Sequence, residues 1–141
     1  MNEEQESLAA VAKASGLPLT KLQGLADRAI LGALSRTYRT CGKPACHCMR
    51  LEDEKHGPHL YLSFRGVEGR TTGFYVPQRY EAAVREGLSA WTQLQRALRR
   101  GVDVGERRRA QRPLWEQAES NAWRLRALWA RPRRRRRRRA S

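Results

Sequence analysis

The stretch HLYLSFRGVEGRTTGFYV, residues 59–76, decides the fold class of this chain. On both sides of GVEG, apolar residues recur at every second position, which is the period of a β-strand with one buried face. The two glycines of GVEG favour a tight connection between antiparallel strands. We therefore expect a hairpin whose inward-facing residues are Leu60, Leu62, Phe64, Thr72, Phe74 and Val76.

A third strand is expected upstream, at residues 33–40 (ALSRTYRT), where Leu34, Arg36 and Tyr38 fall on one face. Together the strands predict a small antiparallel sheet. A sheet of this size is stable only when something covers its apolar face, so helices should pack on one side of it.

Two helices are expected after the sheet. Pro77 favours a helix start, and residues 78–99 carry an apolar stripe at helical spacing. GVDVGE interrupts the pattern, and a last helix with an apolar stripe follows at about 113–130, as the centre of a C-terminal helix domain at residues 106–131. The two stripes are Tyr80, Val84, Leu88, Trp91 and Leu98, and then Trp115, Ala118, Ala122, Leu125 and Trp129. Such seams allow the helices to fold back on each other or to form a homodimer.

Residues 1–32 predict a pair of helices. Acidic residues in the first turn and Gly16 at the end favour a helix at 3–15, and a second helix should end near Ala29 or Gly32. Small and apolar residues fall at the positions of a helix-turn-helix, although a plain helical hairpin fits the same pattern. In a helix-turn-helix, the residues presented to a DNA groove would be Thr20, Lys21, Gln23 and Arg28.

All three cysteines lie in RTCGKPACHCMRLEDEKHGP, residues 39–58. The spacing brings Cys41, Cys46 and Cys48 near His56, and three thiolates with one imidazole are a tetrahedral donor set for Zn²⁺. Four protein ligands leave no open position for a substrate. The zinc would therefore be structural, and the protein would not be an enzyme.

Other interpretations of this cluster stay open. His59 could replace His56 as the fourth ligand. Two cysteines could form a disulfide, Cys46 could act as a nucleophile with His56 as its base, or the thiols could serve as small apolar side chains. A reducing compartment disfavours the disulfide, and the sequence offers no third group that would orient a catalytic base.

Positive charge dominates the composition. Lys and Arg number 29 against 14 acidic residues, which gives a formal net charge of +15 and a pI near 11.2. Such a charge repels itself unless a polyanion partners it, and nucleic acid is the usual partner. The N-terminus lacks the features of a signal peptide, and no apolar run has the length of a membrane span. We therefore expect a cytoplasmic, nucleoid-associated protein with no membrane partner.

The chain ends in Pro132 followed by seven consecutive arginines, residues 133–139. A run of like charges cannot pack against itself, so residues 132–141 should form a disordered tail. This tail would bind phosphates without reading base sequence.

Further cations flank the predicted sheet. If Arg36 or Arg65 faces away from the core, the sheet offers a cation beside Tyr61 and Tyr75. The residues expected to bind nucleic acid are Lys21, Arg28, Arg36, Arg39, Lys43, Arg50, Arg65, Arg70, Arg133, Arg134, Arg135, Arg136, Arg137, Arg138 and Arg139.

Three blocks follow one another within residues 34–99: LSRTYRTCGKPACHC, HGPHLYLSFR and GRTTGFYVPQRYEAAVREGL. In this order they resemble a small uncharacterised prokaryotic family with a CGKPxCxC block, an HGP block and a strand that ends in VP before a long helix. The resemblance implies that Cys41, Cys46, Cys48 and His56 are shared polar positions of that family. It also implies an occurrence near mobile elements and transposases, and no defined activity.

These features predict an α+β fold: a small zinc-stapled three-stranded antiparallel sheet with flanking helices, an N-terminal helical pair and a disordered Arg-rich tail. The predicted domains are residues 1–32, 33–100, 106–131 and 132–141. The predicted function is that of a zinc-stabilised accessory protein of a mobile element that binds nucleic acid, with DNA as the favoured partner and a transposase-like protein as a second. The alternatives are an RNA or ribonucleoprotein binder, or a Cys- or metal-dependent enzyme subunit.

Overall fold

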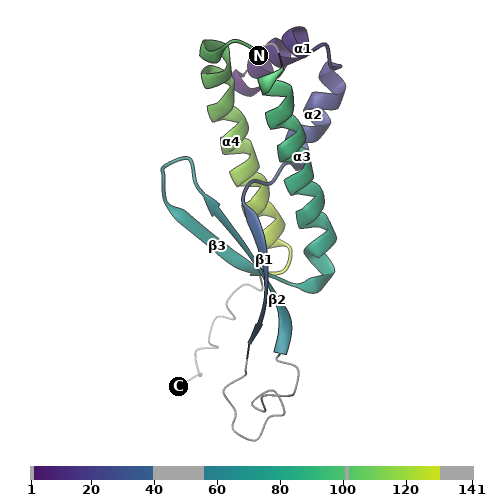
Figure 1. Cartoon of the computed structure of the whole chain (residues 1–141), viewed down its shortest axis with the longest axis vertical. Helices are drawn as coiled ribbons and strands as arrows, with labels where there is room; N and C mark the ends of the chain where they lie inside the picture. The colour runs from purple at the N-terminus through teal and green to yellow at the C-terminus, as the bar shows by residue number, and fades with distance from the viewer. Residues whose placement is uncertain (1, 40–55, 101, 131–141) are drawn as a thin grey trace, which may run out of the picture.

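The computed structural model describes residues 2–39, 56–100 and 102–130 of the chain (Figure 1). Its helices are α1 (Glu3–Ser15), α2 (Leu19–Arg28), α3 (Glu81–Arg99) and α4 (Val104–Ala127), and its strands are β1 (Ala33–Arg39), β2 (His56–Arg65) and β3 (Thr71–Val76). A short 3-10 turn, η2 (Gln78–Tyr80), precedes α3. The part of the chain described here is therefore α+β, with four helices and a three-stranded antiparallel sheet, as predicted.

The helices α3 and α4 form an antiparallel hairpin along the long axis of the molecule (Figure 1). The shorter helices α1 and α2 lie at the end of this hairpin where α3 passes into α4, and α1 packs against α4. The sheet lies along the other half of α4. The end of β1 and the beginning of β2 project beyond the helices (Figure 1).

The sheet has the order β1-β2-β3, and its register aligns Leu34 with Leu62 and Leu62 with Phe74. The predicted inward residues of the hairpin are buried, apart from the half-buried Thr72. Tyr38 was predicted on the face of Leu34 but is 56% exposed. The pairing of β1 with β2 shifts register between Thr37 and Arg39, so the alternation that holds from Leu34 to Arg36 is interrupted at Tyr38.

The connection between β2 and β3 is the tight turn that GVEG predicts. The backbone N–H of Gly66 donates to the carbonyl of Arg70 at 2.9 Å, and that of Gly69 donates to the carbonyl of Gly66 at 2.9 Å. Gly69 has φ of 92°, in the left-handed region that glycine adopts without steric cost.

The two N-terminal helices begin and end near the predicted positions. Asn2 caps α1 by accepting from the backbone N–H of Gln5 at 2.8 Å, and Gly16 ends the helix in the left-handed conformation. The second helix, α2, ends at Arg28, next to the predicted Ala29. The helical pair is confirmed, and its helix-turn-helix role stays a prediction.

The helix α4 begins well before the predicted apolar stripe at 113–130 and close to residue 106, the predicted start of the C-terminal helix domain. The helix begins at Val104, because Asp103 caps it by accepting from the backbone N–H of Glu106 at 3.0 Å. Pro113 lies inside the helix, where it removes one backbone donor without ending the helix.

One hydrophobic cluster joins all four helices to the sheet among the described residues. Its fully buried members include Leu8, Leu22, Leu62, Leu94 and Leu114, and each such side chain contributes about 1.5–3 kcal/mol through burial. The division of the chain into separate N-terminal and central domains stays a prediction.

Asn121 is the one polar side chain that lies fully within this cluster among the described residues. Its Nδ2 donates to the carbonyls of Ala26 and Ala29 at 3.0 and 2.9 Å, while its Oδ1 accepts from Gln117. These bonds fix the end of α2 against α4.

An aromatic cluster joins the sheet to the last turns of α4. The ring of Trp123 lies 5.6 Å from that of Phe64 and 5.5 Å from that of Phe74, and Trp129 contacts Phe74 and Tyr80. Phe64 and Phe74 are buried, Tyr80 and Trp129 of the predicted stripes are half-buried against the core, and Trp123, which neither stripe included, is 39% exposed. No helix in the described ranges has the length and apolar character needed to cross a membrane.

Candidate nucleic-acid interface

Three of the four predicted zinc ligands, Cys41, Cys46 and Cys48, lie outside the described residues. The fourth, His56, is the first residue of β2, and its backbone pairs with Arg39 at the end of β1. Across residues 2–39, 56–100 and 102–130, no group of three or more His, Cys, Asp or Glu side chains could hold a metal ion. The described residues include only one of the four predicted ligands, so the zinc stays a prediction.

The sheet has one face turned away from the helices, which carries Tyr61 and Tyr75. Their rings meet edge to face with centroids 5.1 Å apart, and Tyr75 is 54% exposed. Tyr61 also covers Gly73 on β3: a Cβ there would clash with the Tyr61 ring and with the carbonyl of Leu62. An aromatic side chain that covers an edge glycine pins the register of a sheet.

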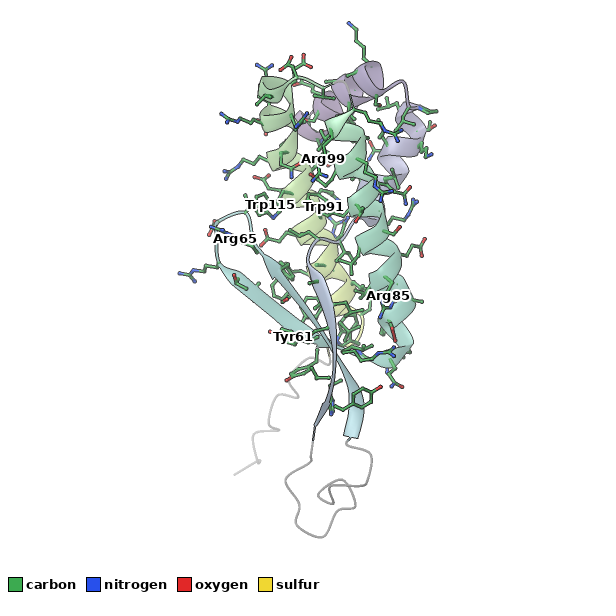
Figure 2. The ribbon with its side chains drawn as sticks, viewed as in Figure 1. Tyr61, Arg65, Arg85, Trp91, Arg99 and Trp115 are labelled. Carbon is green, nitrogen blue, oxygen red and sulfur yellow. The ribbon has the colours of Figure 1, made fainter. Side chains whose placement is uncertain are left out.

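Arg65 lies on this same face and is exposed, as the alternation of β2 predicted. Figure 2 shows it at the β2–β3 turn, beside Trp115 of α4. The indole Nε1–H of Trp115 donates to the backbone carbonyl of Arg65 at 2.9 Å, which attaches the turn to the helix. Arg70, across the turn, is exposed as well.

Arg36 does not lie beside the two tyrosines. It shares the helix-facing side of β1 with Leu34, and its Nη2 contacts both carboxylate oxygens of Glu81 at 3.0 Å. Arg85 donates to the same carboxylate at 2.9 Å. The hydrogen bond from Arg85, followed by the charge and hydrogen bond of Arg36, holds the pKa of Glu81 below its ordinary value. The charge of Arg36 is therefore partly offset within the protein.

The predicted contacts on α2 are exposed. Lys21 faces solvent, and Arg28 donates to the carbonyl of Gly24 at 2.8 Å while its Nε lies 3.8 Å from a carboxylate oxygen of Glu86. The remaining predicted cations have no described side chain; they are Arg39, Lys43, Arg50 and the arginines 133–139.

A further basic region escaped the sequence prediction. It lies where α3 passes into α4, and we name it the hairpin-tip cluster: Arg96, Arg99, Arg100, Arg107, Arg108 and Arg109. None of these arginines has a carboxylate within 4.0 Å among the described residues. The signal was present as two runs, RALRR at 96–100 and ERRRAQR at 106–112, on either side of one turn.

The first turn of α1 borders this cluster. Glu3 and Glu6 line a groove of about 520 Å³ together with Arg108, Arg109 and Arg112 of α4. The acidic turn therefore lowers the positive potential on one side of the cluster without forming an ion pair there.

A family model matches residues 12–86, which is more than half of the chain, and its description is "Domain of unknown function (DUF6788)". The chain belongs to the DUF6788 family. The DUF6788 region contains α2, the three strands and the beginning of α3, so the hairpin-tip cluster and the tail fall outside it. No curated protein and no solved structure matches the chain. The resemblance to a CGKPxCxC family near transposases stays a prediction.

Proposed function

We propose that this DUF6788 protein binds nucleic acid, with DNA as the preferred partner, and that it acts as a non-catalytic accessory protein of a mobile element. One observation carries the proposal: among the described arginines, only Arg28, Arg36, Arg85 and Arg112 lie within 4.0 Å of a carboxylate. Most of the described arginines therefore have no carboxylate beside them that would offset their charge.

The charge is also unevenly placed. The two short runs on either side of one turn contribute three arginines each to the hairpin-tip cluster. Cations held close together neutralise neighbouring phosphates and release counterions, and this release drives non-specific binding to nucleic acid. The tail of seven arginines would add to the same effect.

A structural zinc is part of the proposal, held by Cys41, Cys46, Cys48 and His56. The β1–β2 ladder supports it, since it pairs Arg39 with His56 and so brings together the two ends of the segment that holds the cysteines. Metal content should be about one zinc per chain, and Cys48→Ser should destabilise the protein rather than remove a separate activity. A purified protein without zinc would contradict this part of the proposal alone.

The decisive experiment is a competition among duplex DNA, single-stranded DNA and RNA of equal length, at several salt concentrations. We expect duplex DNA to bind most tightly, and log K to fall linearly with log salt, because phosphate contacts dominate. Equal and salt-independent binding of all three, or no binding, would overturn the proposal.

RNA is the second candidate. The exposed aromatic face of the sheet favours it, because Tyr61 and Tyr75 lie together on one open surface and aromatic side chains stack on unpaired bases. In the same competition, a preference for single-stranded RNA that is lost in Tyr75→Ala would favour this candidate over duplex DNA.

A further inference from the structure

A small groove lies between the end of α3 and the beginning of α4, with a volume of about 270 Å³. Arg99, one of the residues that line this groove, lies at the hairpin tip (Figure 2). The residues that line it are Gln95, Leu98, Arg99, Arg107, Arg108 and Gln111. Three guanidinium groups from two helices therefore border one small space.

This groove has no carboxylate in its lining. Each of the larger grooves compared with it in the described structure contains at least one, such as Glu106, Glu119, Glu116 or Glu86. An anion in the small groove would therefore meet three positive charges and no opposing negative charge from its walls.

Arg107 has unmatched hydrogen-bonding capacity at this place. One Nη2–H donates to the carbonyl of Val102 at 3.2 Å, but its buried Nε has no hydrogen-bond partner in the described structure. A guanidinium carries five N–H donors, and a buried donor without an acceptor is costly. Because the Nε is buried, an oxyanion in the groove would accept from the remaining terminal N–H groups of this half-buried side chain.

The other wall of the groove is held in place by two amides. Gln95 and Gln111 exchange hydrogen bonds of 3.1 and 3.0 Å between their side chains, which join α3 to α4. Each exchange uses one of the two N–H groups of an amide, so a second N–H on each remains available as a donor.

We infer that this groove binds a phosphate group, through Arg99, Arg107 and Arg108. Phosphate fits better than a carboxylate, because its several oxygens can accept from more than one guanidinium fork and its charge balances more of the three cations. The inference rests on the proposed function only for the source of the phosphate, which is either a nucleic-acid backbone or a small phosphate compound.

The test follows the arginine Nε–Hε signals of the full chain by NMR during titration with inorganic pyrophosphate. We expect saturable shifts for Arg99, Arg107 and Arg108, beyond those that sodium chloride of equal ionic strength produces. Equal drift of all arginine signals would mean general screening and would overturn the inference.

Charge-matched variants sharpen the test. Arg99→Gln and Arg108→Gln replace exposed side chains, and each should weaken pyrophosphate binding about tenfold, the effect of losing a charge-assisted hydrogen bond. Arg124→Gln removes the same charge from the opposite half of α4 and should leave the affinity unchanged. Equal effects of all three variants would contradict a defined site.

A short DNA duplex distinguishes the sources of phosphate. If the duplex shifts the same three signals and pyrophosphate displaces it, the backbone of a nucleic acid is the ligand. If pyrophosphate binds in the groove but the duplex does not bind to the protein, the groove is a site for a small phosphate compound and the proposed function fails. If the duplex binds while neither ligand shifts these signals, the phosphate site fails and the proposed function stands.

Discussion

The arginines at the two ends of α3 differ in whether a carboxylate lies beside them. At the first turn, Glu81 accepts hydrogen bonds from both Arg36 and Arg85. At the last turn, Arg99 and its neighbour Arg100 have no carboxylate within 4.0 Å among the described residues. A carboxylate beside an arginine lowers the positive potential there, so the arginines at the last turn are better placed to bind an anionic partner.

The largest expected change is a loss of duplex affinity when arginines at the last turn of α3 are replaced, compared with replacing those at the first turn. The double variant Arg99→Gln/Arg100→Gln should weaken duplex binding about tenfold or more at low salt and reduce the slope of log K against log salt by about two. The matched variant Arg36→Gln/Arg85→Gln removes the same charge, and its slope should change by less. Fluorescence anisotropy at several salt concentrations measures both, and equal slopes would erase the distinction between the two ends.

A smaller change, this time a gain in duplex affinity, should follow when the acidic residues that border the hairpin-tip cluster are replaced. Glu3→Gln/Glu6→Gln takes two carboxylates from the groove that contains Arg108 and Arg109, so duplex binding should tighten several-fold at low salt. The control compares two single variants of equal charge: Glu6→Gln in the groove, and Glu68→Gln at the β2–β3 turn, whose carboxylate has no arginine within 4.0 Å among the described residues. A tightening of equal size in both single variants would show that only net charge matters.

Glu81→Gln should remove the carboxylate at the first turn of α3, so that the arginines there resemble those at the last turn. Without the carboxylate, Arg36 and Arg85 lose their shared partner, so duplex affinity should rise about twofold at low salt. The same binding assay measures it. Unchanged affinity, with circular dichroism showing an intact fold, would mean that these two arginines lie outside the surface that binds DNA.

The smallest effect concerns acid stability. Arg85 and Arg36 lower the pKa of Glu81 from its ordinary value of 4.5, so the ionised carboxylate favours the folded state. This contribution is present above pH 4.5 and is lost as the pH falls through the lowered folded pKa. The Tm of the native protein should therefore exceed that of Glu81→Gln at neutral pH, and the difference should shrink with acidification. A difference that is independent of pH would exclude the ion pair as its cause.

Much of the sheet could be predicted because alternation leaves few choices. Once Leu60, Leu62 and Phe64 face the core, Tyr61 and Arg65 must face away, and the structure confirms both. The position of Tyr38 could not be derived in this way. The pairing of β1 with β2 shifts register between Thr37 and Arg39, and this irregularity depends on the partner strand, which the alternation within 33–40 does not encode.

The functional residues were harder to predict than the fold. Arg36 was correctly placed on the face of Leu34, but its pairing with Glu81 joins residues 45 positions apart and depends on tertiary packing. The hairpin tip was missed because the runs at 96–100 and 106–112 come together only when α4 folds back on α3, which is a tertiary arrangement. The predicted metal site lies mainly outside the described residues, so its geometry stays a prediction.

The hydrogen bonds of Asn121 to Ala26 and Ala29 have a consequence for how the chain folds during synthesis. They join residues 95 and 92 positions apart, and α1 likewise completes its packing only against α4. A nascent chain that ends with the DUF6788 region at residue 86 therefore lacks the helix that buries its own N-terminal segment. Such long-range contacts slow folding, so α1 and α2 should become stable only after α4 has emerged from the ribosome.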